Sequence, residues 1–392
     1  MFTQPNNYWV DLTKPAGRLS ETSRPARYTI AIIAILGIAL RFLVSTRGHN
    51  YDFDSYKLVV AGREEGLTAW QVGRYNYGPV WAHVLYAFNW IESTIGIAFR
   101  VQVIMLLTLA DVFIAGFILA TRNLLTACVF FLNPVSIIIT GYHNQFDNLA
   151  IAMVCVALFI NHDRRRGDLD KSDLWTLLLL GLSLSTKHVF LVFMFWMAVR
   201  QVGLKRRVVY LTVPPAIFVL SFTPFLASSW SGIQKFVIGY DSADNGPLWI
   251  LLGLNDGLGP IPLMALFVVA LSSVGVIVRN RTSAEALFTY LVVIVITTPN
   301  LAGQYFAIAA IGAIGLGSLW FAPYLAIATY VLMLDYHGLH FSSTARFVGI
   351  IILDTPVLTE AIVRFGLIPI SLLVGCAALV VRSRSASKVL MS

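Results

Sequence analysis

The sequence consists of long apolar runs separated by short polar breaks. A run of about 20 apolar residues forms a helix that crosses the hydrocarbon core of a bilayer. The first run, residues 28–46, reads YTIAIIAILGIALRFLVST, and similar runs recur to the end of the chain. We therefore predict about twelve membrane-spanning helices, at residues 28–46, 98–120, 124–141, 149–160, 174–187, 188–202, 208–227, 258–278, 285–299, 304–320, 322–336 and 363–381.

Composition supports a membrane protein. Apolar residues make up 57% of the 392 positions, charged residues 12%, and the mean hydropathy is +0.76. Soluble domains are roughly 45–50% apolar and 25% charged. We expect an all-α, polytopic helical bundle forming a single transmembrane domain over residues 1–392. Residues 1–27 are polar and the run after them has spanning length, so we expect no cleaved signal.

The basic residues predict the orientation of the chain. Most of the 28 Lys and Arg residues fall in alternate breaks between the predicted spans. Cytoplasmic loops carry such an excess, so both termini are expected inside, as an amino-terminal segment (1–27) and a tail (382–392). The RRR at 164–166 then sets topology, and we expect no nucleic-acid partner.

Three longer breaks lie on the opposite, outer side. They are the first extracytoplasmic loop, 47–97, and the segments 228–257 and 336–362. Tryptophan favours the headgroup level of a bilayer. We therefore expect interfacial helices there, with an ordinary aromatic belt as the alternative. Their tryptophans are Trp70, Trp81, Trp90, Trp230 and Trp249.

The first outer loop opens with two carboxylates in HNYDFDSYK, residues 49–57. Asp52 and Asp54 lie two positions apart, which a helix separates by about 200°. Both then serve one point only if the turn between them is irregular. Two plainer readings are a cap formed by Asp54 and Ser55 for a following helix, and a solvated pair.

Other polar groups gather at the outer ends of later spans. GYHNQFDN, residues 141–148, holds His143, Gln145 and Asp147 where a short turn would suffice. Lys187 and His188 follow a span with almost no loop around them, where the lysine either snorkels or binds an anion. Further candidates in the outer segments are Gln304, Tyr305, His337 and His340. Asp111, in mid-span, is expected to meet a donor on another helix.

A carboxylate among cations and amides fits two kinds of function. A carboxylate supplies a general base, and Lys, His and amide donors stabilise charge on a departing phosphate. That combination suits displacement at a phosphate-linked carbon. It would equally suit binding and moving an anionic solute.

Five motifs occur in an order that resembles the GT-C superfamily of membrane glycosyltransferases. YDFDSY is similar to the DFE-type segment of dolichyl-phosphate-glucose-dependent transferases of the N-glycan pathway and their bacterial and archaeal relatives. RYNYGPVW (74–81) resembles their YPPL-type segment, and NPVSIIITGYHNQFDN (133–148) their NP followed by HFQYN. STKHVF (185–190) falls where they carry KQ, and TPNLAGQYF (298–306) resembles a later outer motif.

The resemblance implies roles for individual residues. Asp52 becomes the general base, and Asp54 takes the second acidic position. His143 and Gln145 match the His and Gln of HFQYN, whereas Asp147 stands where that motif has Asn. Lys187 matches the lysine of KQ, and His188 replaces its glutamine. Gln304 stands where relatives have an HEK-like group, which leaves His337 or His340 as the phosphate-binding histidine; Arg63 and Tyr305 complete the donor-binding set.

The implied activity is an inverting transfer of a hexose, such as mannose, from a polyprenyl-phosphate donor to an acceptor hydroxyl. The acceptor is a lipid, a glycan or a protein, and the reaction belongs to glycan biosynthesis at the outer face of a prokaryotic plasma membrane. No cofactor or metal is required, although a divalent ion at DFD stays open. A transporter or flippase of a lipid-linked or anionic solute is the alternative, and a diphosphate-dependent ligase or polymerase a third.

Overall fold

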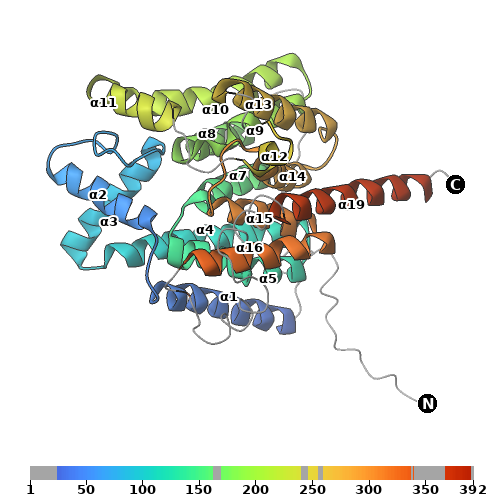
Figure 1. Cartoon of the computed structure of the whole chain (residues 1–392), viewed down its shortest axis with the longest axis horizontal. Helices are drawn as coiled ribbons and strands as arrows, with labels where there is room; N and C mark the ends of the chain where they lie inside the picture. The colour runs from blue at the N-terminus through green and yellow to red at the C-terminus, as the bar shows by residue number, and fades with distance from the viewer. Residues whose placement is uncertain are drawn as a thin grey trace, which may run out of the picture.

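The computed structural model describes residues 24–161, 169–239, 246–254, 259–336, 339 and 367–389. Over these ranges the chain is all-helical, as predicted, and contains no strand. Figure 1 shows helices stacked side by side, with α2, α3 and α11 projecting at one edge. The helices are α1 (Arg24–Ser45), α2 (Tyr51–Glu64), α3 (Pro79–Ile95), α4 (Phe99–Thr121), α5 (Leu124–Phe131), α6 (Pro134–Ile138), η2 (Ile139–His143), α7 (Asp147–Asn161), α8 (Lys171–Thr186), η3 (His188–Phe190), α9 (Leu191–Val199), α10 (Leu204–Ser221), η4 (Thr223–Phe225), α11 (Leu226–Ile233), η5 (Gln234–Ile238), α12 (Pro247–Leu251), α13 (Pro260–Ile277), α14 (Ser283–Thr297), α15 (Tyr305–Leu316), η6 (Leu319–Phe321), α16 (Ala322–Asp335) and α19 (Ile368–Val389).

A helix occupies each of the twelve predicted positions, but a twelve-span bundle is not confirmed. Within the described ranges, four helices are long and apolar enough to cross a membrane: Arg27–Ser45, Phe99–Thr121, Leu204–Ile238 and Pro260–Ile277. The pair Leu124–Phe131 and Pro134–His143, bent by 42°, would make a fifth. Six other apolar helices have 10–17 residues. At about 1.5 Å per residue they fall short of the roughly 30 Å hydrocarbon core, so the number of full spans stays a prediction.

The bundle is built on two buried clusters. The larger is mainly aliphatic, with aromatic residues among its members, and lies where α7 packs on α4 and α8, and where α14 packs on α15. The smaller is aromatic and fixes α2 and α3 of the first loop against the bundle. There, Gly78 approaches the end of α8 so closely that a Cβ on it would lie 1.9 Å from the carbonyl oxygen of Ser185. Glycine at this position therefore allows the N-terminus of α3 to pack beside Lys187.

Three of the five tryptophans expected at the membrane interface pack inside the protein. Trp70, Trp81 and Trp249 are buried inside the protein, whereas Trp90 and Trp230 are exposed. Trp81 stacks on Phe146, with ring centroids 4.2 Å apart. These rings pack the first loop against the bundle, and the position of its helices at a membrane surface stays a prediction.

A buried ion pair ties the first helix to the rest. Arg41 of α1 and Asp111 of α4 are both shielded from solvent, with Arg41 Nη2 2.8 Å from Asp111 Oδ2. Asp111 also accepts from Thr140 at 2.7 Å and from Asn148 Nδ2 at 2.9 Å. The expectation that Asp111 meets a donor on another helix is therefore confirmed.

Candidate functional site

Asp52 lies in the first turn of α2, immediately after the chain leaves α1. The helix begins one turn earlier than a cap at Asp54 would require, because Asn50 is the N-cap and its side chain accepts from the Tyr51 amide. One carboxylate oxygen of Asp52, Oδ2, lies 2.9 Å from His143 Nε2 and accepts from Gln145 Nε2 at 3.0 Å. The Asp52 side chain is 21% exposed, so it is held from within while part of it stays accessible.

The GYHNQFDN segment folds so that it presents His143 and Gln145 to Asp52. Residues 139–143 form a π-helical turn, and Asn144 ends it in the left-handed region, with φ 63°. Asn tolerates this conformation because its short side chain bonds locally, here donating to the carbonyl oxygens of Thr140 and Gly141. The reversal at Asn144 places its two neighbours on the same side, facing α2.

Two further contacts fix this turn. Arg100 of α4 donates from Nε to Asn144 Oδ1 at 3.2 Å and from Nη2 to the carbonyl oxygen of Gly48. Gly141 lies against α1, where a Cβ would be 2.4 Å from the carbonyl oxygen of Arg41. The turn is therefore held from α1 and α4 together, which orients the polar groups before any ligand arrives.

His143 is buried and satisfied on both ring nitrogens. Its Nδ1 bonds the hydroxyl of Tyr336, and Asn50 Nδ2 lies 3.0 Å from Nε2. If Asp52 is ionised, the ring donates from Nε2 to the carboxylate, and Nδ1 bonds Tyr336. This arrangement satisfies the imidazole and keeps the carboxylate in a fixed position.

The surroundings of Asp52 favour its ionised form. Burial alone would raise its pKa, but the hydrogen bond from His143 and the charges of His143 and Lys187 outweigh burial. The pKa of Asp52 therefore lies below its ordinary value of 3.8, and the group is a carboxylate at neutral pH.

Lys187 lies immediately after α8, in a buried pair with Asp147. Its Nζ is 2.5 Å from Asp147 Oδ1. The rings of Tyr77, Phe146 and Tyr305 surround it, with centroids 5.5, 5.7 and 5.4 Å from Nζ. Snorkelling, one of the two alternatives for Lys187, therefore does not describe this inward-facing side chain. Asp147 accounts for its charge, and the rings account for its burial.

Several predicted site residues lie apart from this centre. Asp54 faces outward, 52% exposed, and pairs with His49 at 2.9 Å, as the helical spacing from Asp52 predicts. Arg63 lies in the last turn of α2, 4.8 Å from the centroid of the Tyr86 ring. Eleven residues of helix put Arg63 roughly 16 Å from Asp52 along the axis. The structure does not bring these two residues to the Asp52 centre.

The remaining candidates flank Lys187 or fall outside the described ranges. His188 starts η3 with a buried Nδ1 that has no partner among the described residues. Gln304 is the N-cap of α15 and Tyr305 its first residue. His337 and His340 lie outside the described residues. Across the described ranges, no group of three or more His, Cys, Asp or Glu side chains is placed to hold a metal.

Sequence reasoning missed four residues that complete the centre. Asn50, Arg100 and Tyr336 hold the His143 turn, and Phe146 packs against Lys187. A signal existed for Arg100, because it lies inside a predicted apolar span and a charge there requires a partner. Comparison of the chain with protein-family models, with curated proteins and with solved structures gives no match.

Proposed function

We propose that the chain is a glycosyltransferase that moves a hexose from a polyprenyl-phosphate donor to an acceptor hydroxyl, with Asp52 as the base. The observation that carries the proposal is the Asp52 carboxylate, hydrogen-bonded to His143 and Gln145 and still partly accessible. Its place just after a helix of spanning length suits a substrate whose lipid tail stays in the bilayer. The GT-C resemblance of the motifs is the second support.

In the proposed reaction the acceptor oxygen bonds to the anomeric carbon while the bond from that carbon to the phosphate oxygen breaks. The bonding electron pair leaves with the lipid phosphate, and the acceptor proton passes to Asp52. A carboxylate of lowered pKa is a weak base toward a neutral hydroxyl. The proton therefore moves late, after partial bonding to an oxocarbenium-like carbon has made the hydroxyl acidic.

The environment of Lys187 limits its part in this reaction. Because the Lys187 ammonium group is already paired with Asp147 at 2.5 Å, it would have to share or leave this ion pair to bind the donor phosphate. Its charge lowers the pKa of Asp52, and direct contact with the donor stays a prediction. His188 follows Lys187 directly and has a buried Nδ1 without a partner among the described residues; its contact with the donor also stays a prediction.

The proposal is tested with purified protein in detergent and a panel of polyprenyl-phosphate mannose, glucose, galactose and arabinose. We expect release of polyprenyl phosphate with one donor, together with a glycosylated product seen by mass spectrometry. Detergent abolishes gradients, so turnover there separates a transferase from a transporter or flippase. Binding of a donor without release of polyprenyl phosphate, given membrane extract as acceptor source, would contradict the transferase.

A further inference from the structure

A basic pocket opens at the loop that joins α9 to α10. It is a cavity of about 440 Å³ lined by Arg200, Arg207 and Arg279 together with Asn280. Among the described residues no Asp or Glu lines it. Arg207 and Arg279 bring two exposed guanidinium groups to this one concavity, so the pocket has the charge of an anion site.

Backbone carbonyl groups hold two of these arginines in place. Arg200 donates from Nη1 to the carbonyl oxygen of Arg279 at 3.1 Å, which links the end of α9 to the end of α13. Arg207 donates from Nε to the carbonyl oxygen of Gln201 at 3.0 Å. Arg200 also donates from Nη2 to Ser283 Oγ at 3.3 Å, so it acts as a bridge between the two helix ends. Arg207, fixed through Nε, presents its terminal nitrogens in a set direction, as bidentate recognition of a phosphate requires.

The N-terminus of α10 adds to the positive potential. Its N-cap is Gly203, which has φ 85°, supplies no capping side chain and lines the pocket. The first backbone N–H groups of a helix have no partner within the helix and carry the positive end of its dipole. Beside the arginines, these groups reinforce an anion site.

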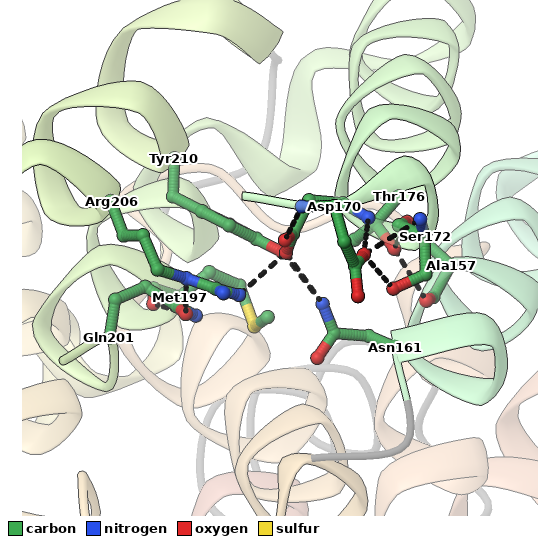
Figure 2. A network of polar contacts seen from close by, with 10 residues as sticks. Ala157, Asn161, Asp170, Ser172, Thr176, Met197, Gln201, Arg206 and Tyr210 are labelled. Atoms are coloured by element: carbon green, nitrogen blue, oxygen red, sulfur yellow. Dashed lines mark hydrogen bonds and ion pairs between the residues drawn. The ribbon is translucent and has the colours of Figure 1, made fainter. Parts of the chain in front are cut away.

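A buried hydrogen-bond network braces this end of the bundle and includes Arg206 but not the adjacent Arg207. Arg206 donates from Nη2 to Asp173 at 2.6 Å, and Tyr210 donates to the same oxygen at 2.6 Å. Figure 2 shows Arg206, Tyr210 and Asn161 converging there, with Gln201 beside Arg206. Arg206 is therefore committed to the interior, whereas Arg207 faces the pocket.

The pocket lies at the end of the bundle opposite Asp52. Asp173 lies in the first turn of α8 and Lys187 directly after its last turn, which separates them by about 20 Å. Apolar side chains flank the basic groups, since Val202 and Val276 line the pocket and are 50% and 41% exposed. We propose that this pocket binds a phosphate group, in the first place the phosphate of an anionic lipid headgroup whose acyl chains contact these valines.

The test compares two double variants of the full-length protein, purified in detergent. Arg207→Gln/Arg279→Gln removes two exposed pocket charges, and Lys205→Gln/Arg281→Gln removes two exposed charges from the same segments outside the pocket. Thermal unfolding is followed while phosphatidylglycerol, phosphatidylcholine or inorganic phosphate is added. We expect phosphatidylglycerol to stabilise the wild type, with an apparent affinity roughly 10–30-fold weaker in the pocket variant and nearly unchanged in the control.

The three additives distinguish a lipid phosphate from free phosphate as the ligand of the pocket. A selective loss in the pocket variant supports the site, and stabilisation by inorganic phosphate alone would identify a free phosphate as its ligand. Equal losses in both variants would show a diffuse attraction to the basic surface and overturn the proposal. Unchanged affinity in the pocket variant would overturn it as well.

Discussion

The Arg41–Asp111 pair provides the most direct test of how α1 is attached to the bundle. Arg41 Nε and Nη2 lie 2.9 and 2.8 Å from Asp111 Oδ2, and Nη2 also donates to Ser136 Oγ at 2.8 Å. Neither partner is exposed to solvent. The substitution to test is Arg41→Met, which keeps an unbranched apolar stem and leaves the Asp111 carboxylate without its counter-charge.

The expected loss of folding stability follows from leaving the buried Asp111 carboxylate unpaired. Removing one partner of a buried ion pair costs about 3–5 kcal/mol, because the remaining charge is uncompensated. Adding Asp111→Asn removes the stranded charge and keeps one of the two acceptor oxygens to which Thr140 and Asn148 donate. We therefore expect the double variant to recover about 2–3 kcal/mol relative to the sum of the single effects.

The assay is the free energy of unfolding in mixed micelles, measured by denaturant titration for each single variant and the double. Arg63→Met is the matched control, since Arg63 is exposed over the Tyr86 ring and its loss should cost about 1 kcal/mol or less. If Arg41→Met costs no more than Arg63→Met, or if the two substitutions at the pair add without coupling, the reasoning fails.

Three further outcomes follow from the site. Because the pKa of Asp52 is lowered, its ionised form and the stability that this form contributes persist above pH 3.8 and are lost as the pH falls through the folded-state pKa. An inflection in wild-type turnover above pH 3.8 that is absent from the residual turnover of Asp52→Asn would contradict this. Gly141→Ala should lower the free energy of unfolding by about 1–3 kcal/mol, because its Cβ meets the Arg41 carbonyl oxygen. The unfolding temperature and turnover should fall together, and unchanged values would refute the close approach. Lys187→Met should destabilise the protein more than Lys187→Met/Asp147→Leu, and donor affinity measured in the double variant then reports whether Lys187 contacts the phosphate.

Hydrophobic pattern alone located the helices well. A helix lies at each predicted run because spanning length and apolar composition are local properties of the sequence. Pattern could not determine how many runs cross completely, since a break such as the bend between Leu124–Phe131 and Pro134–His143 depends on packing. Nor could it place Trp70 or Trp81, because an aromatic ring suits a protein interior as well as a membrane surface.

The centre of the site was only partly accessible to sequence reasoning. The contact of Asp52 with His143 joins residues 91 positions apart, and the order of the motifs was what suggested it. The pairing of Lys187 with Asp147 was missed because both had been assigned to the donor, although two opposite charges at the ends of neighbouring apolar helices favour each other. Arg41 was not recognised as the partner because it lies inside an apolar run, although the mid-span Asp111 required a donor of this kind.

The central claim is that the accessible carboxylate of Asp52 performs the proton transfer. The measurement is the rate of polyprenyl-phosphate release by Asp52→Asn beside Asp54→Asn, two changes of the same kind on one helix turn, with folding checked by unfolding temperature. We predict a loss of roughly 10²–10⁴-fold for Asp52→Asn. Because Asp54 faces His49, its variant should keep most of the rate. Comparable rates in the two variants, or a greater loss in Asp54→Asn, would contradict the claim.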